Sequence, residues 1–297
     1  MGRTIRDGRS CAEDDSVKVL VTGASGFVGR HVVARLLDQG HVVVASARDL
    51  ERARTMDWFD NVEFIPCDLH EDFHPLLDVD ADALIHLAWP GLPDYKGFFH
   101  VSRNLPADIE FLHAVVDAGV SRLIVAGTCL EYGMQFGPLS EELETRPTTP
   151  YGFAKDALRK ALQLLQKEKA FTLQWVRLFY MYGDGQNPRS LLGQLNAAID
   201  ENRAVFDMSQ GDQLRDYLPV TQVATDFVRI LQDSRCHGVI NCCSGDPIAV
   251  ADLVSRWCRA RSSKIELNKG HHPYPDYEPL AFWGVPTKLS GLERLPV

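Results

Sequence analysis

The residues from Val17 to Gly29, VKVLVTGASGFVG, constrain the fold more than any other part of the chain. An apolar run of strand length ends at Thr22, and glycines follow at positions 23, 26 and 29. Such a run is typical of a buried parallel strand, and the glycines permit a tight turn, close approach of a ligand and close packing of the next helix. The pattern predicts a helix over about 27–39, whose free N–H groups and positive end would face an anion such as a pyrophosphate.

Strand and helix signals alternate along the chain as far as Gly183. The expected strands after the first are 41–47, 62–69, 83–89, 122–128 and 173–183, and the expected helices include 102–118 and 151–169. Strands separated by helices pair in parallel through right-handed crossovers. The sequence therefore predicts an α/β fold, a doubly wound parallel Rossmann sheet with helices on both faces.

The pattern changes after Gly183, where one amphipathic helix (190–202) lies between polar loops, and prolines and aromatic residues become frequent near the C-terminus. From this change we predict that the chain is divided into three parts. They are a mobile tail over 1–16, a dinucleotide-binding domain over 17–183 to which 220–245 returns, and a smaller, loop-rich substrate-binding region formed by 184–219 and 246–297.

Composition excludes several classes of partner. The chain has 31 Lys and Arg against 40 Asp and Glu, a formal net charge of -9 that repels nucleic acid and anionic membranes. The longest apolar runs are too short to span a membrane, and the first 16 residues lack the apolar core of a secretory signal. The 7 cysteines are not paired at zinc-ligand spacing, and His271-His272 has no third ligand at useful spacing. We therefore expect a cytoplasmic protein with reduced thiols and no metal.

The end of the second expected strand determines which nicotinamide cofactor the sequence predicts. NAD-binding folds place an acidic residue there to bind the ribose 2′-hydroxyl, whereas this chain has Ser46, Ala47 and Arg48. A guanidinium can clamp a 2′-phosphate bidentately, so we expect NADP(H), with NAD(H) as the alternative. Arg48 would otherwise begin a solvated helix. Asp68, after the third strand, is expected either to meet the adenine edge or to lie in a solvated turn.

Three residues carry the expected chemistry. Tyr151 and Lys155 are four apart in a predicted helix and so lie on one face, where an ammonium would favour the phenolate and lower the pKa of the phenol. Thr128 ends the fifth expected strand, at the edge where open α/β sheets bind ligands. A phenol and a hydroxyl placed together can exchange a proton with, and orient, an alcohol or carbonyl oxygen.

Several motifs together resemble the extended short-chain dehydrogenase/reductases, the NAD-dependent epimerase/dehydratase family, which act on nucleotide-activated sugars. They are GASGFVG, the HLAW at 86–89, Thr128 with Tyr151-x-x-x-Lys155, RLFYMYG at 177–183 and LRDYLPV at 214–220. The resemblance runs from about Val17 nearly to the C-terminus. It implies an oxidoreductase in which Tyr151 is the acid/base, Lys155 lowers the tyrosine pKa and holds the nicotinamide ribose, and Thr128 orients the substrate oxygen.

The resemblance also implies binding residues. For the cofactor these are Gly23, Ser25, Gly26, Phe27, Val28, Gly29, Arg48, Asp68, Leu69, Leu87, Ala88, Trp89, Asn104, Tyr151 and Lys155. For the substrate they are Thr128, Cys129, Glu131, Tyr180, Asn187 and Arg215. Asn104 matches a family asparagine, and Arg215 matches the family arginine that contacts the sugar-nucleotide phosphates.

Departures from the family pattern narrow the expected reaction. Cys129-Leu130 stands where the 4,6-dehydratases carry Asp-Glu, which argues against dehydration, and Tyr180 replaces a common asparagine near the sugar. The 4-epimerases usually retain NAD and the second-strand acid, which is missing here. The main expectation is therefore NADPH-dependent reduction of a nucleotide-linked 4-keto-6-deoxy sugar to the 4-hydroxy sugar, in activated deoxysugar biosynthesis. The alternatives are a nucleotide-sugar 4-epimerase with retained NAD and a non-catalytic NADP-binding sensor or scaffold.

Two further questions stay open at this point. Cys129 beside the site is either an acid/base in keto-sugar epimerisation or a small packing residue, and His86 is expected to be a packed residue near the cofactor. The apolar stripes of helices 102–118 and 151–169 either form a four-helix homodimer interface, as in family members, or are ordinary core faces.

Overall fold

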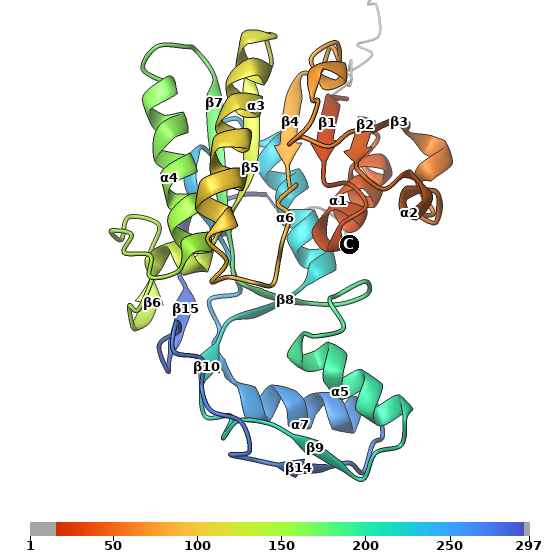
Figure 1. Ribbon diagram of the computed structural model, residues 1–297, viewed down its shortest axis with the longest axis vertical. Coiled ribbons are helices and arrows are strands. Elements are labelled where there is room, and N and C mark those ends of the chain that lie inside the picture. Colours follow the sequence, from red (N-terminus) through yellow and green to blue (C-terminus); the bar gives the residue numbers. More distant parts are fainter. Residues whose placement is uncertain (1–15, 294–297) are drawn as a thin grey trace, which may run out of the picture.

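A computed structural model describes residues 16–293 of the chain, so the expected N-terminal tail falls almost entirely outside the described residues. A 7-stranded sheet with the order β12-β7-β5-β4-β1-β2-β3 organises the upper part of Figure 1, and all its neighbouring strands pair in parallel. Its strands are β1 (Lys18–Thr22), β2 (Val42–Ala47), β3 (Glu63–Pro66), β4 (Ala83–His86), β5 (Arg122–Thr128), β7 (Thr172–Leu178) and β12 (Gly238–Cys242). The predicted doubly wound parallel sheet is confirmed.

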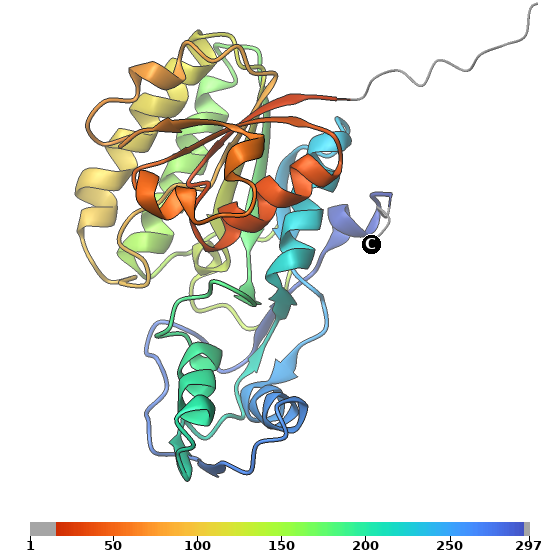
Figure 2. The same cartoon turned by 90° about the vertical axis from the view of Figure 1, so that its right-hand side faces the viewer.

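Helices cover both faces of this sheet, as the side view in Figure 2 makes plain. One face carries α1 (Phe27–Asp38) and α6 (Val220–Gln232), and the other carries α3 (Leu105–Asp117) and α4 (Pro150–Leu165). Successive strand residues point to opposite faces, so both faces of the sheet are buried and the strands read as continuous apolar runs. The short helix α2 (Leu50–Arg54) follows β2, and a π-helical turn (His100–Asn104) leads into α3.

A smaller part of the chain, which we call the cap, lies below the carboxyl ends of the strands (Figure 1). Its helices α5 (Leu191–Asp200) and α7 (Val250–Ala260) enclose a separate apolar cluster. Four small two-stranded sheets complete the fold: β10 (Leu214–Arg215) with β13 (Ile248–Ala249), β11 (Tyr217–Pro219) with β8 (Tyr180–Tyr182), β14 (Glu266–Asn268) with β9 (Val205–Asp207), and β15 (Phe282–Gly284) with β6 (Gly137–Leu139). The short helix α8 (Thr287–Ser290) follows. The C-terminal region thus contains the helix α7, which the sequence analysis did not predict.

The expected strand 173–183 is divided between the two parts of the molecule. β7 belongs to the main sheet, but the chain changes partner at Phe179, whose N–H donates to Cys242 O, and the N–H of Tyr180 then donates to Asp216 O. The following residues form β8 and pair with β11 at the base of the cap. Over residues 16–293, none of the helices has the length and apolar character needed to cross a membrane.

Candidate active site

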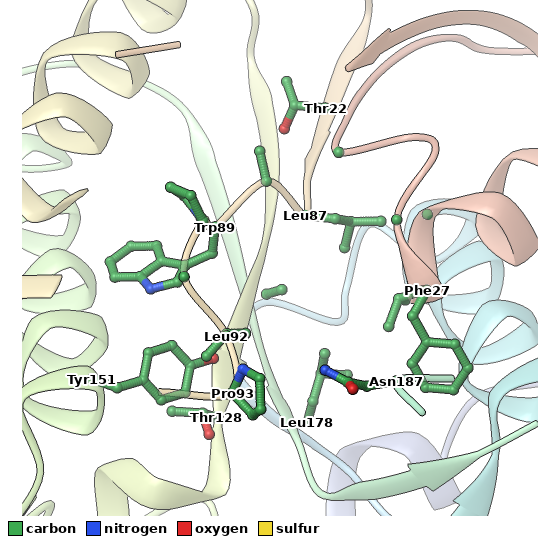
Figure 3. A pocket seen from close by; sticks show the side chains of 18 of the residues that line it. Thr22, Phe27, Leu87, Trp89, Leu92, Pro93, Thr128, Tyr151, Leu178 and Asn187 are labelled. Atoms are coloured by element: carbon green, nitrogen blue, oxygen red, sulfur yellow. The ribbon is translucent and has the colours of Figure 1, made fainter. Parts of the chain in front are cut away.

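A cavity of about 850 Å³ opens at the carboxyl ends of the central strands, between the sheet and the cap. From β1 the chain adds β2 and β3 on one side and then β4, β5, β7 and β12 on the other, so the strand order reverses between β1 and β4. Ligands of doubly wound sheets bind at this point. Residues of β1, β4, β5 and the cap converge there (Figure 3).

The loop between β1 and α1 forms one wall of the cavity. Gly23 has φ +70°, and a Cβ on Gly29 would lie 2.2 Å from Gly23 O, so both positions require glycine. The N-cap Gly26 offers no side-chain cap, and the first turn of α1 contains no acidic residue. The first N–H groups of α1 are therefore available to an anion, as a dinucleotide-binding loop requires.

Thr128, Tyr151 and Lys155 all line this cavity. Thr128 ends β5, and its side chain lies beside that of Tyr151, which projects from the first turn of α4 (Figure 3). Thr149 caps α4 by accepting a hydrogen bond from the N–H of Gly152 at 3.0 Å, which holds this turn against β5. The Lys155 ammonium lies 3.8 Å from the centre of the Trp89 ring. The three residues thus form one group at the sheet edge.

Burial dominates the acid–base properties of this group. It lowers the pKa of Lys155 from 10.5 to about 8, and it raises the pKa of Tyr151, to which the neighbouring Tyr95 adds, against a smaller lowering by Thr128. The sequence predicted the opposite direction for Tyr151, and that prediction is wrong for this structure. The reasons are the burial of the phenol and the placement of Lys155, which is directed to the Trp89 ring.

The pKa of the Cys129 thiol is also raised, first by burial and then by the nearby Glu278 carboxylate. A buried thiol held in its protonated form is a poor acid/base, which favours the packing interpretation of Cys129. His86 is fully buried as expected, with Nδ1 2.9 Å from Thr22 Oγ1 and Nε2 3.1 Å from Asp108 Oδ2.

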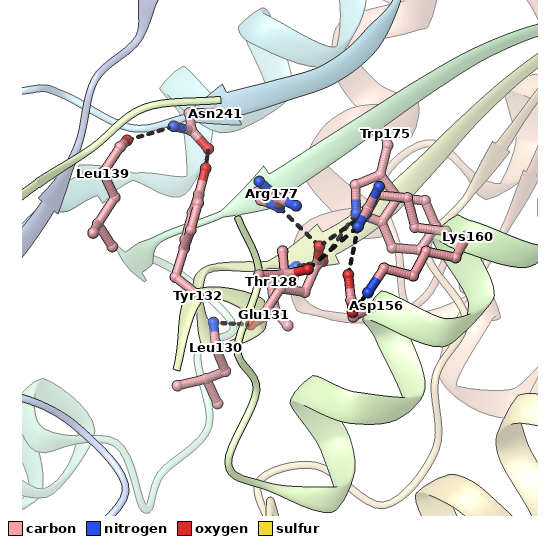
Figure 4. A network of polar contacts seen from close by, with 12 residues as sticks. Thr128, Leu130, Glu131, Tyr132, Leu139, Asp156, Lys160, Trp175, Arg177 and Asn241 are labelled. Carbon is pink, nitrogen blue, oxygen red and sulfur yellow. Dashed lines mark hydrogen bonds and ion pairs between the residues drawn. The ribbon is translucent and has the colours of Figure 1, made fainter. Parts of the chain in front are cut away.

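Glu131, expected in the substrate site, instead supports the turn below Thr128. Its carboxylate is fully buried and accepts hydrogen bonds from Thr128 N at 2.9 Å, Trp175 Nε1 at 2.9 Å and Arg177 Nε at 2.8 Å (Figure 4). It lies outside the residues that line the cavity. Arg159 Nε, 3.7 Å away, connects this carboxylate to Asp156 on α4.

Arg215 and Asn104 also lie outside the lining of the cavity. The Arg215 guanidinium donates to Leu280 O at 3.1 Å and to Glu278 Oε2 at 3.1 Å, and it packs 4.6 Å from the Phe282 ring. Its donors are therefore used within the protein and do not reach the cavity. Asn104 donates to Pro90 O at 2.9 Å and so holds the loop that forms part of the cavity wall.

The other predicted site residues do line the cavity, and their binding roles stay predictions. They are Gly23, Ser25, Gly26, Phe27, Val28, Gly29, Arg48, Asp68, Leu69, Leu87, Ala88, Trp89, Cys129, Tyr180 and Asn187. The cavity also contains charged or aromatic residues that the sequence analysis missed, including Asp49, His70, Tyr95, Asp108 and Glu278. Most of these lie in loops without a periodic signal. Within residues 16–293, three or more His, Cys, Asp or Glu side chains nowhere gather in a way that could hold a metal ion.

Arg48 does not stand alone at the end of β2. Its Nη1 lies 3.6 Å from Asp68 Oδ2, and both residues line the cavity. Asp49 lines it too, and caps α2 by accepting a hydrogen bond from the N–H of Arg52 at 2.9 Å. Asp49 and Asp68 therefore lie beside Arg48 at this edge, together with Arg52, and both carboxylates would oppose a 2′-phosphate.

Comparison with known proteins identifies the family. The model of the NAD dependent epimerase/dehydratase family matches residues 19–243. The chain belongs to this family. It is therefore an enzyme of the class that the sequence resembled, and that expectation is confirmed.

Individual members of the epimerase/dehydratase family are similar in sequence or structure to this chain over most of their length. A protein of Aggregatibacter actinomycetemcomitans named dTDP-6-deoxy-L-talose 4-dehydrogenase (NAD(+)) is 29% identical over 273 residues, 90% of this chain and 99% of that protein. A UDP-glucose 4-epimerase of Halalkalibacterium halodurans is 27% identical over 233 residues, 69% of this chain and 68% of that protein. The solved structure of MoeE5 with UDP-glucuronic acid and NAD superposes with a TM-score of 0.80 at 27% identity, covering 94% of each chain.

The expectation of NADP(H) is contradicted by these relatives of the epimerase/dehydratase family. MoeE5 holds NAD, and the Aggregatibacter protein is named for NAD(+). The physical reason lies in the pairing of Arg48 with Asp68, since the carboxylate compensates the guanidinium on which the expectation rested. The glycine loop and the uncapped start of α1 fit the pyrophosphate that such a dinucleotide contains.

Proposed function

We propose that the protein catalyses oxidation and reduction at C4 of a nucleotide-linked sugar with NAD as its cofactor, and that the net reaction is C4 epimerisation. The observation that carries this proposal is the group formed by Thr128, Tyr151 and Lys155 in the same cavity as the glycine loop. Relatives named as a 4-dehydrogenase and a 4-epimerase support C4 as the reacting position.

In this proposal, residues of the chain bind NAD, orient the C4 oxygen of the sugar and move one proton. The loop at Gly23 and the start of α1 hold the pyrophosphate of NAD, and Asp68 or Asp49 accepts hydrogen bonds from its ribose. Thr128 orients the C4 oxygen, and Tyr151 takes the proton of the alcohol or returns one to the ketone. The Lys155 ammonium, beside the Trp89 ring, holds the nicotinamide ribose. Bound NAD supplies the hydride acceptor and donor.

Net dehydrogenation at C4, or its reverse, is the second candidate. The relative named as a 4-dehydrogenase is similar over nearly its whole length, which favours this candidate. Net reduction of a 4-keto-6-deoxy sugar was the main expectation from the sequence. Its support is now the similarity to this relative, and NADPH is no longer proposed as the reductant.

One incubation separates these functions. The protein with NAD+ is given UDP-glucose, dTDP-glucose or GDP-mannose, while NADH absorbance and the NMR spectrum of the sugar are followed. Formation of the C4 epimer without accumulation of NADH supports the epimerase. Accumulation of NADH with loss of two hydrogens from the sugar indicates the dehydrogenase instead. The protein is then tested with 4-keto-6-deoxy sugars and NADH in the same way. Binding of the cofactor without conversion of any of these nucleotide sugars would support the non-catalytic sensor or scaffold.

We also infer a homodimer through the outer faces of α3 and α4. The inner stripes of both helices are core, as Phe111 and Leu158 are fully buried against the sheet. Ile109 on α3 and Phe153 and Leu164 on α4 are exposed large apolar residues on the same two helices. Light scattering of the purified protein tests this inference, and a monomer at all concentrations would contradict it.

A further inference from the structure

Glu278 places a negative charge in the cavity close to the reacting group. It comes from the loop between β14 and β15, and among the described residues it lines the cavity together with Thr128, Cys129, Tyr151 and Tyr180. The other lining carboxylates lie elsewhere, with Asp49 after β2, Asp68 after β3 and Asp108 bonded to His86. The carboxylate also raises the pKa of Cys129 and Tyr180, in each case after the larger effect of burial.

Arg215 holds this carboxylate from behind. Its Nη2 donates to Glu278 Oε2 at 3.1 Å, and its Nη1 donates to the carbonyls of Leu214 and Leu280 at 2.9 and 3.1 Å. The guanidinium is 2% exposed and lies outside the cavity lining, whereas Glu278 faces the cavity. A bound molecule therefore meets the carboxylate before it meets the arginine.

The loop that carries Glu278 contacts the loop that contains Tyr95 and Lys96. Asp276 forms an ion pair with Lys96, at 2.7 Å, and the ring of Tyr277 packs 5.8 Å from that of Tyr95. Tyr95 in turn lies 5.6 Å from the Tyr151 ring and accepts a hydrogen bond from the Tyr151 N–H at its carbonyl oxygen. These contacts connect the loop of Glu278 to Tyr151 through Tyr95.

We infer that Glu278 is a specificity-determining residue, which restricts the enzyme to nucleotide sugars whose hexose is uncharged and excludes uronic acids. This inference rests on the proposed function, because it concerns the sugar that Thr128 and Tyr151 would bind. A carboxylate on the sugar would meet a second carboxylate in a partly buried site, and like charges so placed repel strongly. The hydroxyls of a neutral sugar can instead donate to Glu278.

The test compares two matched pairs of ligands that differ only in the carboxylate, UDP-glucose with UDP-glucuronic acid and GDP-mannose with GDP-mannuronic acid. Calorimetry measures the binding of each to the NAD-loaded protein, and turnover is measured in parallel. We expect the neutral member of at least one pair to bind about tenfold or more tightly than its uronic acid. Glu278→Gln should shrink that ratio at least about tenfold through tighter binding of the uronic acid, while Glu278→Asp should preserve it.

Glu266→Gln provides the matched control, since it removes an exposed carboxylate at the start of β14, outside the cavity, and should leave the ratio unchanged. If Glu278→Gln is too unstable to purify, the double variant Glu278→Gln/Arg215→Met removes both buried charges and serves the same comparison. Two results overturn the inference but not the proposed function. One is equal binding of both members of each pair by the native protein. The other is a ratio of neutral-sugar to uronic-acid binding that neither Glu278→Gln nor the double variant changes. Failure of every nucleotide sugar to bind, with NAD binding intact, overturns the proposed function and this inference with it.

Discussion

The backbone N–H of Thr128 donates to Glu131 Oε1 at 2.9 Å, three residues along the chain. The other oxygen of this carboxylate accepts a hydrogen bond from Arg177 on β7 at 2.8 Å. The hydroxyl that is proposed to orient the substrate is thus attached to a buried ion pair that spans two neighbouring strands (Figure 4). Its position depends on a residue that touches neither cofactor nor substrate.

Replacing Glu131 with Gln should therefore destabilise the fold. The amide can still accept from Thr128, but Arg177 loses its ion partner while 1% exposed, and an unpaired buried charge costs about 3–5 kcal/mol. Urea unfolding measures this loss. Glu144→Gln is the control, because its ion pair with Arg146 is solvent-exposed and its loss should cost less than about 1 kcal/mol. Equal stability of the two variants would show that the buried pair contributes little.

Tyr151→Phe should abolish most turnover while leaving NAD bound. The variant keeps the ring that packs against Trp89 and Tyr95 but removes the hydroxyl that exchanges the proton. General acid–base catalysis contributes roughly 100- to 10,000-fold, so kcat should fall by that factor. Calorimetric titration with NAD measures binding separately. A variant with near-native kcat would rule out Tyr151 as the acid/base.

Activity should decline as the pH rises past about 8. Burial lowers the pKa of Lys155 to about 8, so the ammonium is present below this pH and lost above it. The same shift affects stability with the opposite sign, because the folded-state pKa lies below the ordinary 10.5 and the buried charge is unfavourable. That penalty is present below pH 8 and is relieved as the pH rises from about 8 to 10.5. Profiles of kcat and of unfolding free energy against pH would test both signs.

Lys155→Arg separates this group from other causes of an alkaline decline. A guanidinium remains charged over the whole range, so the decline of kcat should move to higher pH in any active variant. A decline that stays at the same pH would assign it to a different group.

The native protein should bind NAD more tightly than NADP, and Asp68→Asn should reduce the difference. The asparagine keeps an oxygen to accept the hydrogen bond from His70 N, but it releases Arg48 and removes the charge that opposes a 2′-phosphate. We expect NADP affinity to rise at least about tenfold. Asp72→Asn in the same loop, outside the cavity, is the control. Unchanged NADP affinity in Asp68→Asn would place the discrimination at another residue, such as Asp49.

The sheet could be predicted because its signals are local. The strand expected over 122–128 is β5 to the residue, since an unbroken apolar run there ends in a polar residue at the sheet edge. The division of 173–183 at Phe179 could not be predicted, because both sides are equally apolar and only the pairing partner changes. The helix α7 was missed because its N-cap, Ala249, makes no side-chain capping hydrogen bond and so leaves no start signal.

The candidate site was predictable where spacing within one element determines it, as for Tyr151 and Lys155 on α4. It was not predictable where charged residues have distant partners. Glu131 was predicted to bind substrate as the acid nearest to Thr128, and Arg215 because it matches the family arginine that contacts the phosphates. Their partners Arg177 and Glu278 lie 46 and 63 residues further along the chain, and only the folded structure brings them together.

The change of partner at Phe179 has a consequence for building chimeric enzymes. β7 ends at Leu178 and β8 begins at Tyr180, so one residue separates the nucleotide-binding sheet from the base of the cap. A cap taken from a relative would have to be joined at this residue without a gained or lost position. A shift of one residue would turn the side chains of β8 to the opposite face and remove Tyr180 from the cavity. Evolution of new sugar specificities in such a chain is therefore easier by substitution within the cap than by changing the length of this junction.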